Sequence, residues 1–200
     1  MLRTQRESNA TALRVTRTLL TNIQLFYNMN IRHLEGYDDI RARSRINALA
    51  WREAYQGLLP EEVLDGMDED PSEEQVEATY EQLREDSDGI LIAEDDDGTV
   101  RGYLYLRWGE ETKSFVNEGE ADLKEIYVSP DSWGQGIGTE LLERGLTLLP
   151  EDIHRVKLEM LSGNEVGRSF YESRGFERIE TSEFEIAGDS YPTDIYTLER

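Results

Sequence analysis

Three glycines stand within five positions of the segment SPDSWGQGIGTELL, residues 129–142. A run of β-forming residues at about 120–128 precedes this segment, and apolar residues at helical spacing come after it. A strand, a glycine-rich turn and a helix N-terminus together make an anion site, because free amide N–H groups and the positive end of the helix dipole converge on one point. The segment therefore predicts an anion held by backbone amides.

The spacing of the glycines narrows the kind of anion site. A P-loop needs four residues between its glycines and then Lys-Ser/Thr, whereas here Thr139 follows Gly138 with no lysine, which excludes a nucleotide-hydrolysis loop. The dinucleotide fingerprint Gly-x-Gly-x-x-Gly is a weak match, because Thr139 stands where its third glycine belongs. A tight turn alone would need one glycine rather than three.

Composition excludes several other classes of protein. With 200 residues the chain is long enough for one domain with a hydrophobic core. Its net charge of −22 repels phosphate backbones, and no basic patch is present, so we expect no nucleic-acid partner. No apolar run approaches the roughly 18 residues of a membrane span. The absence of cysteine excludes disulfides, thiolate metal sites and a cysteine nucleophile, and with no secretory signal it favours the cytoplasm.

Two features of the charge pattern have a simple interpretation. Lysine accounts for only three of the 21 basic residues, and the others are arginine. Strong acidity with little lysine favours a halophilic protein, which concentrated salt relieves of self-repulsion; an ordinary acidic protein is the alternative. The run EDDDG at residues 94–98 lacks the spacing of a calcium loop, so it predicts a solvated turn, and we expect no metal site.

The charge balance also divides the chain. Residues 1–28 carry four arginines and one glutamate, the reverse of the acidic balance in residues 29–200. We interpret residues 1–28 as an N-terminal appendage or an overlong reading frame, and residues 29–200 as the functional domain. A basic amphipathic helix that binds a membrane or a partner is the alternative for the first segment.

Hydrophobic periodicity predicts a mixture of helices and strands after residue 29. We expect helices over residues 38–54, 72–84, 137–149 and 164–174. We expect strands just after residue 29, over residues 90–94, 100–108, 120–128 and 156–161, and as an antiparallel pair near the C-terminus. Asp97-Gly98 is a strong hairpin signal between two of them. The fold class expected is therefore α/β, in the mixed α+β sense.

Two motifs resemble the GCN5-related N-acetyltransferase (GNAT) family. In that family Arg/Gln-x-x-Gly-x-Gly/Ala after the fourth strand wraps the pyrophosphate of acetyl-CoA, and WGQGIG matches it from Gly136 onward, with Trp133 in place of the usual Arg or Gln. NEVGRSFYESRGF is similar to the family segment Asn-x-x-Ala-x-x-Phe-Tyr-x-x-x-Gly-Phe, with Gly167 in the small-residue slot. The resemblance covers about residues 30–198. It implies a mostly antiparallel sheet of six or seven strands, splayed at its centre, with about four helices.

The resemblance also implies how acetyl-CoA is held. The amides of residues 134–139 take the pyrophosphate, and the strand that ends at Val128 pairs its backbone with the pantetheine arm. Asn164 contacts the cofactor where the fourth and fifth strands part, and an ordinary N-cap is its alternative or additional role. The cofactor-binding residues implied are Val128, Trp133, Gly134, Gln135, Gly136, Ile137, Gly138, Thr139 and Asn164.

Tyr171 and Glu125 are the catalytic residues that the resemblance implies. Tyr171 stands in the tyrosine slot of the second motif and would protonate the CoA thiolate; a ring packed against the sheet is the alternative. Glu125 is the nearest to the cofactor of three carboxylates on or before the fourth strand, the others being Glu120 and Asp122. It would deprotonate the amine through water, and a solvated surface group is the alternative.

The expected function is transfer of an acetyl group from acetyl-CoA to a primary amine by direct attack. The acceptor is a small molecule or a protein N-terminus, and Trp51, Tyr55 and Tyr191 either line its pocket or belong to the core. We expect a monomer or a homodimer. A non-catalytic acyl-CoA-binding sensor or interaction subunit is the alternative, and the presence of Tyr171 favours the enzyme.

Overall fold

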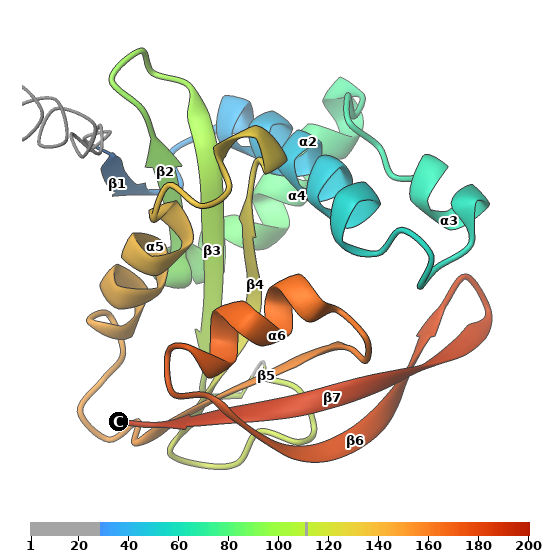
Figure 1. The fold of residues 1–200 in the computed structure, drawn as a ribbon. Coiled ribbons are helices and arrows are strands. Elements are labelled where there is room, and N and C mark those ends of the chain that lie inside the picture. The colour runs from blue at the N-terminus through green and yellow to red at the C-terminus, as the bar shows by residue number, and fades with distance from the viewer. Residues whose placement is uncertain (1–28, 111) are drawn as a thin grey trace, which may run out of the picture.

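The computed structural model describes residues 29–110 and 112–200, so the predicted appendage at residues 1–28 lies outside the described residues. Seven strands form one sheet in the order β1-β2-β3-β4-β5-β7-β6 (Figure 1). The strands are β1 (Asn30–His33), β2 (Ile90–Glu94), β3 (Val100–Trp108), β4 (Glu120–Val128), β5 (Arg155–Leu161), β6 (Glu177–Ile186) and β7 (Asp189–Glu199). The α-helices in the described part are α2 (Tyr37–Ala54), α3 (Glu61–Asp65), α4 (Glu73–Leu83), α5 (Ile137–Leu146) and α6 (Glu165–Glu172). Two short 3₁₀ helices are η1 (Arg84–Gly89) and η2 (Pro130–Ser132).

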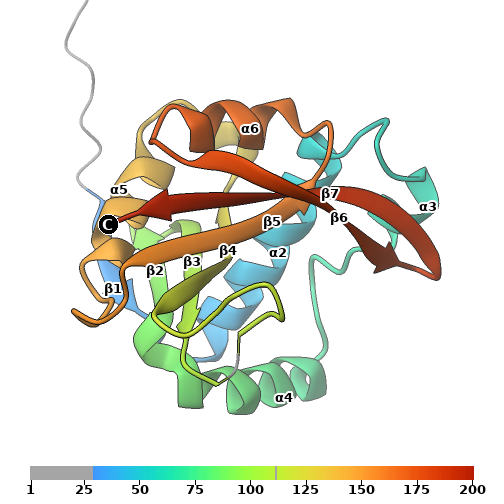
Figure 2. The same cartoon turned by 90° about the horizontal axis from the view of Figure 1, so that it is seen from below.

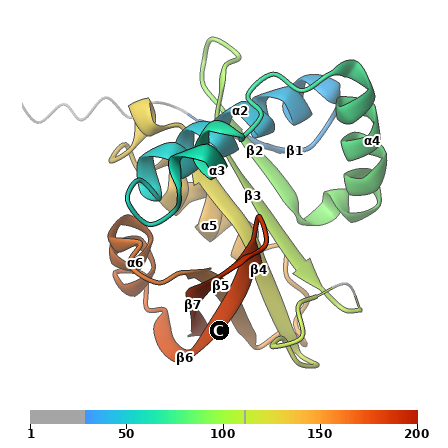
Figure 3. The same ribbon diagram turned by 90° about the vertical axis from the view of Figure 1, so that its right-hand side faces the viewer.

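Alternation along the strands divides the core between the two faces of the sheet. On β2, Leu91 and Ala93 pack in a cluster with Leu141 of α5, while Ile90 and Ile92 pack in a second cluster with Val76 of α4. The helices follow this division: α5 and α6 lie on one side of the sheet and α2 and α4 on the other (Figures 2 and 3). The sheet is therefore covered on both faces.

The sheet is split near its centre. All neighbouring strands are antiparallel except β4 and β5, which are parallel and pair over only three positions, from Glu120 with Arg155 to Asp122 with Lys157. Beyond these pairs β4 and β5 diverge in direction (Figure 1). The second half of β4 therefore has β3 on one side and no strand on the other.

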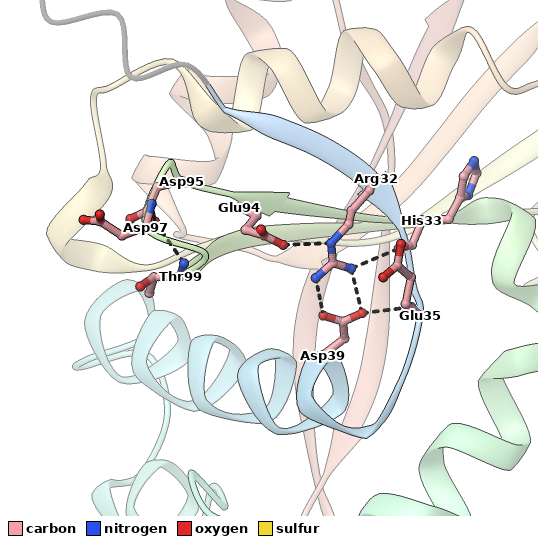
Figure 4. A network of polar contacts seen from close by, with 8 residues as sticks. All are labelled: Arg32, His33, Glu35, Asp39, Glu94, Asp95, Asp97 and Thr99. Carbon is pink, nitrogen blue, oxygen red and sulfur yellow. Dashed lines mark hydrogen bonds and ion pairs between the residues drawn. The ribbon is translucent and has the colours of Figure 1, made fainter.

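A network of ion pairs fixes helix α2 to the edge of the sheet (Figure 4). Arg32 on β1 donates to both carboxylate oxygens of Asp39 on α2, at 2.8 Å each, and to Glu94 on β2 at 2.8 Å. The backbone N–H of Glu35 also donates to Asp39, at 2.8 Å. Asp39 is 4% exposed, so its charge is buried but matched. The network holds the helix whose far end reaches the cavity at the centre of the sheet.

Most of the expected elements are confirmed, including the mixed fold class, the seven-stranded sheet and its central splay. The strands predicted over residues 90–94, 100–108 and 120–128 have those bounds, and Asp97-Gly98 forms the hairpin turn, with Gly98 at φ +78°. The sequence analysis missed α3, which begins directly after Pro60, because five residues are too few to show helical periodicity. Within residues 29–110 and 112–200, no helix has both the length and the apolarity needed to cross a membrane.

Candidate active site

A cavity of about 390 Å³ follows the open edge of β4. One end lies at residues 132–139, where the chain passes from β4 to α5, and the other lies at Leu123, Lys124 and Glu125. Residues of α2, β5 and α6 complete the walls. The cavity therefore lies where the two halves of the sheet separate.

The edge of β4 that lies away from β3 presents backbone hydrogen-bonding groups to this cavity. Ser129 N–H donates to Arg101 O at 2.8 Å, across to β3. Because backbone groups alternate in direction along an antiparallel strand, those of the preceding residue, Val128, point away from β3 toward the cavity. An extended ligand lying in the cavity can pair with this edge as an added strand does.

The glycine loop at the other end presents a row of free amides. Gly134 and Gly136 have φ values of +77° and +91°, a region that favours glycine, and the loop ends at the N-terminus of α5. Among the described residues, the amides of residues 134–138 donate to no backbone carbonyl, whereas Thr139 N–H donates to Gly136 O at 3.0 Å. The loop thus offers convergent donors at the positive end of a helix, which suits a pyrophosphate.

Close packing explains the third glycine of the loop. A Cβ atom on Gly138 would lie 3.0 Å from the ring of Phe170 on α6. The glycine therefore lets α6 approach the first turn of α5, which brings the second motif of the sequence against the first.

Trp133 stands where the family has Arg or Gln, and its side chain forms a hydrogen bond within the protein. Its indole Nε1 donates to Val128 O at 2.7 Å, joining the loop to the end of β4. One acceptor site of the carbonyl expected to contact the pantetheine arm is thereby in use, while the Val128 N–H still faces the cavity. Gln135 is exposed and does not line the cavity, and its side chain donates to Asp131 O at 3.3 Å.

The sequence matches known acetyltransferases. Residues 43–176 match the family described as the acetyltransferase (GNAT) family. The chain belongs to this family. It is 23% identical to the uncharacterised N-acetyltransferase YuaI of Bacillus subtilis over 151 residues, which cover 76% of this chain and 82% of YuaI.

Solved GNAT structures share the fold. The PaiA N-acetyltransferase of Thermoplasma acidophilum, solved in complex with coenzyme A, superimposes with a TM-score of 0.65 at 22% identity and covers 86% of this chain and 99% of its own. The ribosomal-protein-alanine N-acetyltransferase of Brucella melitensis has a TM-score of 0.60 at 21% identity, with coverages of 86% and 99%.

In this GNAT chain Asn164 caps helix α6 and also lies at the cavity. It is the N-cap of α6, where its Oδ1 accepts from Gly167 N–H at 2.9 Å, and it also lines the cavity beside the splay. A Cβ on Gly167 would come within 2.8 Å of both Asn164 and Met160, which explains glycine in the small-residue slot.

Tyr171 packs its ring in the core and also lines the cavity. The ring centroid lies 5.2 Å from that of Phe170 and 5.4 Å from that of Phe176, both edge to face. Burial raises the pKa of its hydroxyl well above the ordinary value, and nearby Tyr55 adds to the effect. The hydroxyl therefore stays protonated over the whole neutral range, as a proton donor must.

Glu125 lies at the opposite end from the glycine loop and is not a free carboxylate. Both of its oxygens contact Nη2 of Arg43 on α2, at 2.7 and 2.5 Å, and only 13% of its side chain is exposed. Glu159 on β5 is a second carboxylate that lines the cavity, with contacts of 2.7 Å to both Lys113 and Thr193. The sequence analysis missed Glu159, because nothing in the strand pattern marks which face meets the cavity.

Arg174 is a further residue that the sequence analysis missed. It follows α6 and lines the cavity beside the glycine loop, where its guanidinium donates to the Thr139 hydroxyl and stacks 3.8 Å from the centroid of the Phe170 ring. Its Nε is buried and has no hydrogen-bond partner among the described residues. Trp133 gave a hint of this role in the sequence. It stands where the family has Arg or Gln, so another polar side chain could be expected beside the loop.

The aromatic candidates for an acceptor pocket separate into two groups. Tyr55 lines the cavity, whereas Trp51 and Tyr191 pack with it in a hydrophobic cluster without lining the cavity. Trp51 Nε1 donates to the Tyr127 hydroxyl at 2.9 Å, which ties α2 to β4. Among residues 29–110 and 112–200, no group of three or more His, Asp or Glu side chains is arranged to hold a metal ion.

Proposed function

We propose that this protein is an N-acetyltransferase that moves the acetyl group of acetyl-CoA to a primary amine. The observation that carries the proposal is that one cavity joins a cradle of free amides at its glycine loop to Tyr171 and Glu125. Acetyl-CoA supplies an activated thioester. The amides of residues 134–138 and the guanidinium of Arg174 hold its pyrophosphate, and the open edge of β4 and Asn164 orient its arm.

Two side chains handle the protons in this proposal. Tyr171, which is protonated at neutral pH, gives the proton of its hydroxyl to the departing thiolate. Glu125 takes a proton from the incoming amine through water and, in doing so, gives up part of its contact with Arg43. No covalent attachment of the acetyl group to the protein is required.

The proposal also covers the class of acceptor, the cellular compartment and the salt concentration in which the protein works. We expect the acceptor to be a small amine or a protein N-terminus, and the name of the Brucella relative, a ribosomal-protein-alanine N-acetyltransferase, indicates that this fold serves the second kind in that protein. We place the activity in the cytoplasm, in keeping with a sequence without cysteine, and propose a halophilic setting from the net charge of −22.

The proposal is tested by release of free CoA thiol. Wild-type protein in molar salt is incubated with acetyl-CoA and a panel of amines, amino acids and peptides, and the thiol is measured against time. Gly136→Val is the control, because the residue has a φ of +91° that valine rarely adopts, so the amide cradle is distorted and acetyl-CoA binding is lost.

The alternative, an acyl-CoA-binding sensor, predicts a different result. Tight binding of acetyl-CoA by calorimetry with no thiol release from any acceptor would favour the sensor. Failure to bind acetyl-CoA at all would refute both functions.

A further inference from the structure

A β-bulge places one lysine at the acceptor end of the cavity. On β4, Leu123 pairs with Leu106 and Glu125 pairs with Tyr105, so Lys124 lies between two adjacent pairs without a partner of its own on β3. Lys124 and Glu125 both line the cavity, as do the other residues from Leu123 to Val128 along this edge of β4. The Lys124 ammonium lies beside Tyr105 and Glu125 at this end of the cavity.

This end of the cavity is where an acceptor must enter. The glycine loop takes the phosphates at the opposite end, and Lys124 lies four residues back along β4 from Val128, roughly 13 Å away at the usual rise per residue. The side chain of Lys124 is 31% exposed, so it is partly open to solvent.

Among the described residues, the ammonium of Lys124 has no close carboxylate of its own. Its nearest carboxylate oxygen, on Glu125, is 3.9 Å away, and that carboxylate already holds Arg43 at 2.5 Å. The other nearby carboxylate, Asp122, is paired with Arg107. Among residues 29–110 and 112–200, three cations thus face two carboxylates, which leaves one positive charge in surplus within a protein of net charge −22.

The aromatic surroundings hold this cation in place without neutralising it. Lys124 Nζ lies 4.8 Å from the centroid of the Tyr105 ring, and the guanidinium carbon of Arg107 lies 5.8 Å from the same centroid. Burial lowers the pKa of Lys124, nearby Glu125 opposes this effect, and Arg107 and Arg43 reinforce it. An anion beside the ammonium would relieve this unfavourable setting.

We propose that Lys124 forms an anion subsite at the acceptor end, which selects acceptors that carry a carboxylate close to their amine, as free amino acids do. The proposal rests on the acetyl transfer proposed above. The ammonium binds the acceptor's carboxylate and so directs the adjacent amine toward Glu125. Polyamines and amines without an anionic group meet a surplus positive charge instead, and bind less well.

The test compares acceptors that differ only in the carboxylate. For several L-amino acids, kcat/KM is measured beside the C-terminal amide and beside the amine that lacks the carboxyl group. Wild type should prefer the acid by about 10- to 100-fold, the range of a hydrogen bond to a charged group. In Lys124→Met the preference should fall to near one, through loss of kcat/KM for the acid alone. Lys124→Arg keeps the charge and should keep most of the preference.

Two controls separate the subsite from general effects. Arg84→Met removes an exposed cation from η1, outside the cavity, and should leave the preference unchanged. Acetyl-CoA affinity, measured by calorimetry, should be the same in wild type and Lys124→Met, because the phosphates bind at the other end.

Several results would overturn the subsite while leaving acetyl transfer intact. These are equal use of acids and amides by wild type, an unchanged preference in Lys124→Met, or acetylation of Lys124 itself, seen as an acetyl mass gain on its peptide in the absence of acceptor. If no amine is acetylated, the proposed function fails, and the subsite is then judged by calorimetric binding of amino acids and their amides to the CoA-bound protein. Equal binding by wild type and Lys124→Met would refute it.

Discussion

Tyr171 packs in the core and is also the residue proposed to donate a proton. Its ring contacts Phe176 of the core, and the residue also lines the cavity. The two expectations raised from the sequence, general acid and core residue, are therefore compatible in space. Burial also raises the pKa of the hydroxyl, so the group is protonated at neutral pH.

Replacing Tyr171 by phenylalanine separates the two roles. Tyr171→Phe keeps the ring and removes the hydroxyl, so we expect the melting temperature and acetyl-CoA affinity to stay close to wild type. If the hydroxyl is the acid, kcat should fall by about 10²- to 10⁴-fold. Steady-state rates give kcat, and calorimetry gives the acetyl-CoA affinity and the melting temperature. An unchanged kcat, with pre-steady-state data showing that chemistry limits turnover, would leave Tyr171 as a core residue.

Glu125 and Glu159 are carboxylates that line the cavity, and mutation can compare their roles. If Glu125 is the base, Glu125→Gln should lower kcat by about 10²- to 10⁴-fold, and the rate should recover in part as rising pH supplies more neutral amine. Glu159→Gln is the matched variant from the other wall, held by Lys113 and Thr193. A larger loss in Glu159→Gln would transfer the role to Glu159. Melting temperatures of both variants show whether unfolding contributes.

Among the elements, the short contact between β4 and β5 controls the shape of the site. The two strands pair at only three positions, and a buried ion network lies on the first of them. Glu120, 3% exposed, contacts Arg155 at 2.8 Å and Lys157 at 2.6 Å. Strong pairing at one end and none beyond it lets the strands part sharply, which creates the cavity.

The charge of Glu120 predicts how this contact responds to pH. Burial alone would raise its pKa, but hydrogen bonds from Lys157, the Asn117 backbone and Arg155 outweigh burial and lower the pKa to about 2. Because the folded-state pKa lies below the ordinary 4.5, the stabilisation is complete above pH 4.5 and is lost as the pH falls toward 2. Its size is about 3 kcal/mol.

Glu120→Gln tests this pH dependence. The variant should lose about 3 kcal/mol of unfolding free energy at pH 7, and the difference from wild type should shrink between pH 5 and pH 2. Urea unfolding in molar salt at several pH values measures it. A difference that is the same at pH 7 and pH 3 would show that the carboxylate is not stabilised in the way described.

For the whole molecule, the excess of 43 acidic over 21 basic residues opposes the compact state. Many of the arginines are placed where they offset it: Arg32 pairs β1 with α2, and Arg43 pairs α2 with β4. The remaining acidic groups repel one another over a distance that salt controls, about 30 Å at 0.01 M and about 3 Å at 1 M ionic strength.

Thermal melting in increasing KCl tests the importance of this repulsion. We expect the melting temperature to rise most steeply below about 0.5 M, where screening changes fastest, and more slowly above it. A neutral osmolyte at matched concentration is the control and should give no steep initial rise. A melting temperature that does not depend on salt would contradict both the repulsion and the halophilic interpretation.

The sequence allowed much of this fold to be predicted, because its strands alternate clearly and its glycine loop has few possible uses. The site was harder to predict. The pair of Glu125 with Arg43 joins residues 82 positions apart, and the cavity positions of Glu159 and Arg174 depend on how α6 and β5 pack. The bulge at Lys124 leaves no mark in the residue pattern, since it is defined only by pairing with β3.

The two ends of the cavity also have consequences for the order of events during turnover. Gly136 is exposed and the Lys124 side chain is 31% exposed, and the two residues line opposite ends of the same cavity. If acetyl-CoA enters at the loop and the acceptor at Lys124, as proposed, the two substrates do not compete for access, and spent CoA can depart before the acetylated product. Initial rates should therefore show the intersecting lines of a ternary complex, with CoA competing against acetyl-CoA but not against the acceptor.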